Sequence, residues 1–129
     1  MLAVSDGRDV DALRDAAEAC PGSLVLLADD AEMLLDSPAE HVLIEVLKHA
    51  ESGAPRALVV AGATDRMAST YHGITVEARR SRCGFLLSPG SSLDGELLGV
   101  RVPKATDRRP GRGVLVMNGE VQPIQAIHG

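Results

Sequence analysis

Two adjacent carboxylates, Asp29 and Asp30, directly follow a run of apolar residues and are the side chains best suited to chemistry. The run Leu24–Ala28 is typical of a central parallel strand covered on both faces, so the acids should emerge at its carboxyl end. Open α/β sheets bind ligands at that end. Two acids placed there could hold a metal ion and polarise a water molecule beside a nucleotide. A second interpretation is that they begin a turn and cap the next helix.

The flanking sequence predicts a β-α-β unit that would hold these acids. A helix is expected from an N-cap at Asp9 to about Cys20, where Pro21-Gly22 ends it. Ser37-Pro38-Ala39-Glu40 has the pattern of a capping box and predicts a helix from Pro38 to about Glu51, stopped by Gly53. Its expected buried residues are Val42, Leu43, Val46 and Leu47. A buried strand at Arg56–Ala61 should then pair in parallel with Leu24–Ala28.

The C-terminal half predicts shorter elements. Residues 65 to 82 favour a helix that is broken near Gly73, and Gly84–Ser88 is typical of a short strand. One or two helical turns are expected at Leu93–Leu98. Strands at Gly113–Met117 and Val121–Ala126 flank Asn118-Gly119, which is a strong hairpin signal.

The 129-residue length predicts a single domain spanning residues 1–129 with one core. No segment approaches the roughly 20 apolar residues that cross a bilayer, so we expect a cytoplasmic protein. Its charge is uneven: residues 1–51 carry twelve acids and three bases, whereas residues 52–129 carry six acids and ten bases. This polarity could bring the acidic part of one copy against the basic part of another, or simply leave two solvated surfaces.

Several segments, taken in order, resemble the C-terminal half of an FtsK/SpoIIIE-type ATPase domain, and most closely the degenerate ATPase modules of the EccC/EssC proteins of type VII secretion. The matching segments are Leu24–Leu34, Leu58–Ala61 with Thr64, Arg79–Pro89, Glu96–Val100, Pro110–Val116 and Asn118–Gln122. The resemblance implies a three-layer α/β fold with a mostly parallel sheet, like the distal half of a RecA-like P-loop core, closed by a C-terminal antiparallel hairpin. It also implies that Asp29 and Asp30 are a Walker B-like pair and that Thr64 is a sensor-like residue.

The pattern departs from the family in one respect, because no Gly-x-x-x-x-Gly-Lys-Ser/Thr motif is present to cradle phosphates. Active members usually have Glu at the position of Asp30, and the shorter Asp would hold a base farther from the attacking water. We therefore expect a truncated or degenerate module that does not hydrolyse ATP by itself and needs no cofactor alone. ATP and Mg²⁺, with Asp29 as the metal ligand, would bind only if a P-loop half completed the site.

Three arginines, Arg79, Arg80 and Arg82, could reach a phosphate or a neighbouring subunit, or could be solvated cations at a helix end. The histidines and cysteines match no metal-ligand spacing.

The first functional hypothesis is a non-hydrolysing module for protein interaction or regulation, with a secretion substrate or a neighbouring ATPase module as partner. The alternative is the C-terminal part of an active secretion or DNA translocase whose Walker A half lies upstream or on a partner. The net charge of −5 and the shortage of aromatic residues argue against nucleic acid as a partner. A half-sheet would leave an apolar edge, so self-association is expected as well. Any position at the inner face of the membrane would depend on a partner or on a missing N-terminal region.

Overall fold

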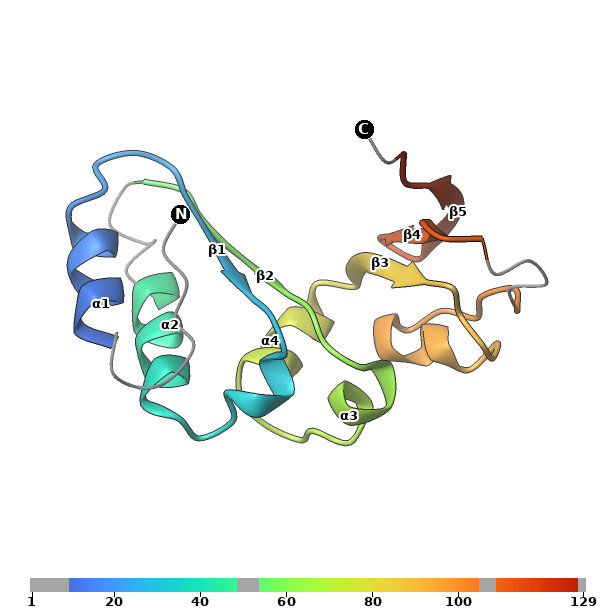
Figure 1. Cartoon of the computed structure of the whole chain (residues 1–129), viewed down its shortest axis with the longest axis horizontal. Helices are drawn as coiled ribbons and strands as arrows, with labels where there is room; N and C mark the ends of the chain where they lie inside the picture. The colour runs from blue at the N-terminus through green and yellow to red at the C-terminus, as the bar shows by residue number, and fades with distance from the viewer. Residues whose placement is uncertain (1–9, 49–53, 105–108, 128–129) are drawn as a thin grey trace.

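The computed structural model describes residues 10–48, 54–104 and 109–127, which form a mixed α/β structure with two separate sheets. The first sheet pairs β1 (Leu24–Ala28) with β2 (Arg56–Val60) in parallel, with Leu26 opposite Leu58. Helices α1 (Val10–Glu18) and α2 (Pro38–Lys48) lie on one side of this pair (Figure 1). The predicted β-α-β unit and its parallel pairing are confirmed.

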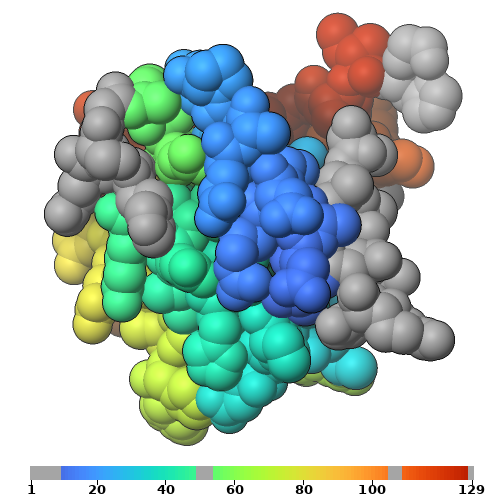
Figure 2. Space-filling view, turned by 90° about the vertical axis from the view of Figure 1, so that its left-hand side faces the viewer, coloured from blue at the N-terminus to red at the C-terminus, as the bar shows by residue number. Residues whose placement is uncertain are grey.

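The N-terminal core forms where these helices meet the strands. Figure 2 looks onto this end of the molecule and shows α1 and α2 packed side by side. The buried side chains come from one stripe of each helix and from alternate strand residues, as a period of 3.6 and a period of two require. They include Leu13, Ala17, Leu26, Ala28, Val42, Leu43 and Val46. The expected N-cap Asp9 and the expected helix end at Glu51 and Gly53 lie outside the described residues.

Glu40 connects α2 to a later helix through a buried carboxylate. Half of the predicted capping box is present: the Glu40 N–H donates to Ser37 Oγ at 3.2 Å, but the Ser37 N–H donates to Leu34 O and not to the Glu40 side chain. The carboxylate itself, in a side chain only 4% exposed, accepts from the N–H groups of Asp36 at 2.8 Å and Ile74 at 2.9 Å. Ile74 is the first residue of α4 (Ile74–Arg80). Gly73 precedes it at φ +81, where an added Cβ would overlap Glu40 Oε1, so only glycine fits there.

The second sheet is antiparallel, in the order β3-β4-β5. Its strands are β3 (Cys83–Leu87), β4 (Arg112–Met117) and β5 (Glu120–Gln125). The predicted hairpin is confirmed: Asn118 and Gly119 have φ of 51° and 86°, as a tight primed turn requires. The outer strand β5 carries Pro123, opposite Val114 of β4.

A separate small core supports the antiparallel sheet from one side. The 3₁₀ helix η3 (Asp94–Leu98) packs there, within the stretch that was expected to be helical. The buried residues are Leu86, Leu98, Val102, Val114 and Val116. In Figure 1 this unit lies at the opposite end of the long axis from α1 and α2.

Two expectations about the sheet are wrong. A single, mostly parallel sheet was expected, but β3 pairs antiparallel with β4 and the two sheets are separate. The strand Leu24–Ala28 was expected to be covered on both faces, yet Val25 is 60% and Leu27 is 69% exposed. The expected helix between residues 65 and 82 is broken near Gly73, as predicted, into α3 (Thr64–Ala68) and α4. None of the described helices is both long enough and apolar enough for a bilayer crossing.

Candidate functional site

The carboxyl ends of β1 and β2 meet at one edge, which is where the sequence places its candidate residues. Beyond the paired strands, the Ala61 N–H donates to Ala28 O at 2.8 Å and the Ala31 N–H donates to Ala61 O at 2.9 Å. The turn that follows β1 and the turn that follows β2 are therefore joined by backbone hydrogen bonds. Asp29, Asp30 and Thr64 belong to these two turns.

Asp29 and Asp30 are both exposed and form the beginning of a turn. Asp29 Oδ1 accepts from the Asp30 N–H at 3.0 Å, so this carboxylate is bound to its own turn. Asp30 has φ 46° and ψ 46°, a left-handed conformation that Asp tolerates better than most residues. It stands at the N-cap of η1 (Ala31–Met33), but its side chain makes no capping hydrogen bond. A role for Asp29 in Mg²⁺ binding stays a prediction, and the described residues contain no group of three or more potential ligands.

Glu32 is the acid that reaches from the first turn to the second. Its Oε1 accepts from the Ala63 N–H at 3.4 Å, while its Oε2 is buried with no hydrogen-bond partner among the described residues. The carboxylate lies so close to Gly62 that an added Cβ at that position would overlap Oε2. Thr64, the expected sensor-like residue, is half-buried and is the first residue of α3. The sequence offered one sign of this contact, a glycine just after β2 where a neighbouring backbone or side chain comes close.

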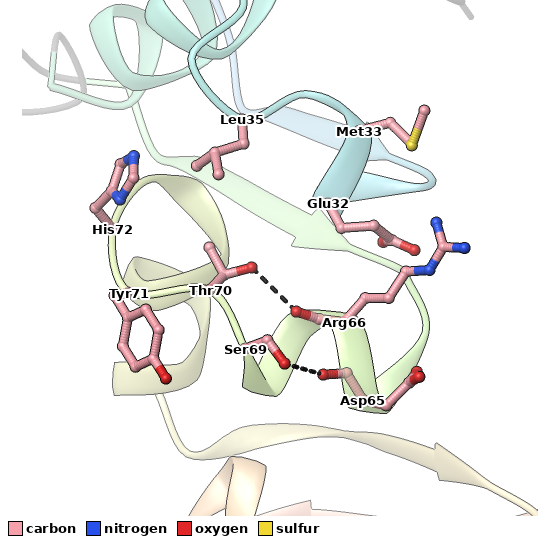
Figure 3. A pocket seen from close by; sticks show the side chains of 9 residues that line it. All are labelled: Glu32, Met33, Leu35, Asp65, Arg66, Ser69, Thr70, Tyr71 and His72. Carbon is pink, nitrogen blue, oxygen red and sulfur yellow. Dashed lines mark hydrogen bonds between the residues drawn. The ribbon is translucent and has the colours of Figure 1, made fainter.

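A shallow pocket of about 450 Å³ lies beside Glu32, between η1 and the segment that includes α3. Figure 3 shows Glu32, Met33 and Arg66 toward one end of this pocket, and Tyr71 and His72 toward the other. His72 Nε2 lies 3.2 Å from Asp36 Oδ1. Nine residues line the pocket: Glu32, Met33, Leu35, Asp65, Arg66, Ser69, Thr70, Tyr71 and His72. Asp29, Asp30 and Thr64 are not among them, so the structure does not bring the expected Walker B-like pair into this pocket.

The three candidate arginines have different environments. Arg79 Nη1 donates to the backbone carbonyls of Met67 at 3.2 Å and Thr70 at 3.0 Å, so it closes the C-terminal end of α3. Arg80 is exposed and pairs with Glu77 on the same helix. Arg82 is exposed, with φ +50. A role for these arginines toward a phosphate or a partner stays a prediction, and Arg80 and Arg82 are the two that face solvent.

Each sheet also presents an apolar face to solvent. The N-terminal face consists of Val25, Leu27 and Val59, in which Leu27 and Val59 are register partners. The C-terminal face consists of Phe85, Leu87 and Met117. These six side chains are 50 to 69% exposed, although strand residues of this kind are normally the ones that proteins bury. The two faces hold six of the ten large hydrophobic residues that are exposed in the described parts of the chain.

Comparisons with family models, with curated proteins and with solved structures give no match for this chain.

Proposed function

We propose that this chain is a non-hydrolysing protein-interaction or regulatory module, related to the distal half of an FtsK/SpoIIIE-type ATPase domain of the type VII secretion kind. The observation that carries the proposal is the pair of apolar faces on β1–β2 and β3–β4. Contiguous apolar surface rimmed by polar residues is typical of surfaces that bind other proteins. The proposed partners are a secretion substrate or a neighbouring ATPase module.

The family relationship is supported by the order of the segments and by the parallel pair at the candidate site. β1 ends in two acids, and the turn after the neighbouring strand β2 leads to Thr64. In this proposal the helices on one side of β1 and β2 would be the counterpart of one outer layer of a three-layer RecA-like core. In that arrangement the N-terminal face would be the surface on which the opposite layer packs.

Inactivity toward ATP follows from the chemistry that the residues lack. The two lysines, Lys48 and Lys104, follow no glycine pattern that could wrap a phosphate chain. Asp29 is hydrogen-bonded within its own turn, and the position of the water-polarising acid holds the shorter Asp30. Phosphoryl transfer depends on positioning and on charge stabilisation, so loss of the cradle removes most of the catalytic effect.

One observation favours the alternative, in which the chain completes an ATP-binding translocase with a Walker A half supplied upstream or by a partner. The acids after β1 and Thr64 after β2 share one sheet edge, which is the arrangement that a nucleotide site of this class uses. Asp29 would then hold Mg²⁺, and Arg80 or Arg82 would face the phosphates of a neighbouring subunit.

Isothermal titration calorimetry with ATP and Mg²⁺ tests the proposal on the chain as it stands. We expect no binding in the micromolar range and no release of phosphate. Micromolar ATP affinity that is lost in Asp29→Asn would contradict the proposal and support the alternative. Asp94→Asn is the matched control, because Asp94 is in η3 and accepts hydrogen bonds from the Gly90 and Ser91 N–H groups, away from the strand ends. ATP affinity lost equally in both variants would indicate damage to the fold and not a site at Asp29.

A further inference from the structure

The N-terminal face and the C-terminal face lie in regions of opposite charge. The described residues of the N-terminal helices and of the parallel pair, 10–48 and 54–60, carry nine acids and three bases. The described residues that form the antiparallel sheet and its small core, 82–104 and 109–127, carry three acids and five bases. The net charges are therefore −6 and +2, and Figure 1 places α1 and α2 at one end of the long axis and the antiparallel sheet at the other.

This charge distribution selects among the possible ways of covering the faces. Two N-terminal faces brought together would place two strongly acidic regions against each other, which is unfavourable. An N-terminal face brought against a C-terminal face of another copy places opposite charges around an apolar centre. A second copy of this chain therefore has the complementary surface that each face requires.

The exposed area agrees with an interface that uses both faces. Each of the six side chains exposes roughly 80 to 100 Å² of apolar surface, which gives about 500 Å² for one copy. Because interfaces are about 60% apolar, this corresponds to about 800 Å² per partner, the size of a standard stable interface. One face alone would supply about half of that area, so a single contact between copies would be much weaker than two, and a closed pair is favoured.

We propose that two copies of this chain form a two-fold dimer in which the N-terminal face of each packs on the C-terminal face of the other. The dimer rests on the proposed interaction function, because it uses the same two faces as the docking surface. It adds that a second copy of this chain covers them. The dimer contains two equivalent contacts, each between an acidic and a basic region.

Sedimentation velocity on the intact chain, from about 1 to about 100 μM, tests this directly. The expected species has twice the monomer mass of 13.5 kDa. Leu27→Ser and Phe85→Ser should each weaken the dimer by about tenfold or more, because each substitution damages both contacts. Leu93→Ser is the matched control: Leu93 is 57% exposed and lies at the N-cap of η3, outside both faces. If either serine variant unfolds, Val59→Thr and Leu87→Thr repeat the test. Threonine makes the same two faces more polar but has a high propensity for β-strands.

Mixing the two serine variants gives the decisive measurement. In the one-to-one heterodimer, one contact joins two intact faces and the other joins two damaged faces. Each variant alone has damage in both contacts, so the heterodimer should recover part of the affinity, whereas pairing of like faces would damage both contacts of the heterodimer. No recovery on mixing would overturn the pairing of unlike faces. A wild-type chain that stays monomeric at 100 μM, or a dimer that is indifferent to both substitutions, would overturn the dimer as proposed.

The dependence on salt tests the electrostatic part. Raising the ionic strength from about 0.05 to about 0.5 M shortens the screening length from about 14 to about 4 Å, and the dimer should weaken. A dimer that tightens with salt would contradict the pairing of acidic with basic regions. A monomeric chain that also fails to bind ATP would overturn the dimer and leave the proposed interaction function standing. Micromolar ATP binding by a dimeric chain would overturn the proposed non-hydrolysing interaction function and leave the dimer standing.

Discussion

Replacement of Glu40 by alanine should destabilise the fold more than any other single change to a charged residue described above. Glu40 Oε1 accepts a hydrogen bond from the N–H of Ile74, a residue that is only 1% exposed. Water therefore cannot easily replace the carboxylate as the acceptor. Hydrogen bonds to charged groups contribute about 1.5 to 3 kcal/mol, and a buried unsatisfied donor costs about 1 to 3 kcal/mol. The second bond, from the exposed Asp36, is more easily replaced by water and is worth about 1 kcal/mol. We expect Glu40→Ala to lower the free energy of unfolding by about 3 to 4 kcal/mol.

Urea denaturation, followed by far-UV circular dichroism, measures this change as a shift of the midpoint at constant slope. Glu40→Gln keeps one acceptor oxygen but turns its NH₂ group toward the other N–H. Its loss of unfolding free energy should therefore lie between zero and that of Glu40→Ala. Glu77→Ala is the matched control, since this exposed glutamate pairs with Arg80 on the same helix and should cost less than about 0.5 kcal/mol. A Glu40→Ala loss below about 1 kcal/mol, or a loss equal to that of Glu77→Ala, would refute the reasoning.

A double-mutant cycle with Gly73 identifies the contact itself. Gly73→Ala introduces a Cβ that overlaps Glu40 Oε1 and imposes strain at φ +81, so it should be strongly destabilising in the wild type. In the Glu40→Ala background the overlap disappears and only the backbone strain remains. The two substitutions should therefore be less harmful together than their separate effects predict. Strict additivity would show that the carboxylate does not occupy the position described.

Three further changes test the environment of the candidate site and the hairpin. Gly62→Ala should lower stability by less than about 1 kcal/mol, because Glu32 Oε2 is the end of a flexible side chain that can move aside, and Glu32→Ala should remove the effect; thermal unfolding of the two single variants and the double variant checks both statements. Arg79→Ala removes two hydrogen bonds to carbonyl groups and should cost about 1 to 3 kcal/mol in urea denaturation, whereas Arg80→Ala should cost less than about 0.5 kcal/mol, and equal effects would contradict the assignment. Gly119→Ala forces a Cβ into a turn with φ +86 and should lower the midpoint by an amount equivalent to about 1 kcal/mol, and an unchanged midpoint would exclude the primed turn.

Local signals in the sequence were sufficient for most individual elements. The strand Leu24–Ala28 has the predicted bounds because its apolar run is enclosed by Gly22-Ser23 on one side and by Asp29 on the other. The capping bond from Ser37 to the Glu40 N–H follows from residues three apart in the chain. These features depend on neighbours in sequence, which is why a single sequence predicts them.

Features that depend on distant segments could not be predicted in the same way. An apolar run such as Leu24–Ala28 is compatible with a strand covered on both faces and with one that leaves Val25 and Leu27 exposed, because the run does not specify what packs on it. The antiparallel partner of β3 lies about 30 residues away, beyond the reach of any local pattern. For the same reason the sequence placed Asp29, Asp30 and Thr64 at the carboxyl edge of β1 and β2 but did not single out Glu32, whose contact needs Gly62 from the turn after β2.

Pro123 on the outer strand β5 has a consequence for how this protein can aggregate. An edge strand ordinarily offers a row of unpaired backbone groups on which a further strand can be added, and proline interrupts that row because it has no N–H to donate. Growth of the antiparallel sheet by strand addition is therefore obstructed on the β5 side. The same sheet is open on the β3 side, whose strand has no proline. Growth of this sheet by strand addition would have to proceed from β3, so this strand is one place for a solubilising charge when the protein is prepared at high concentration.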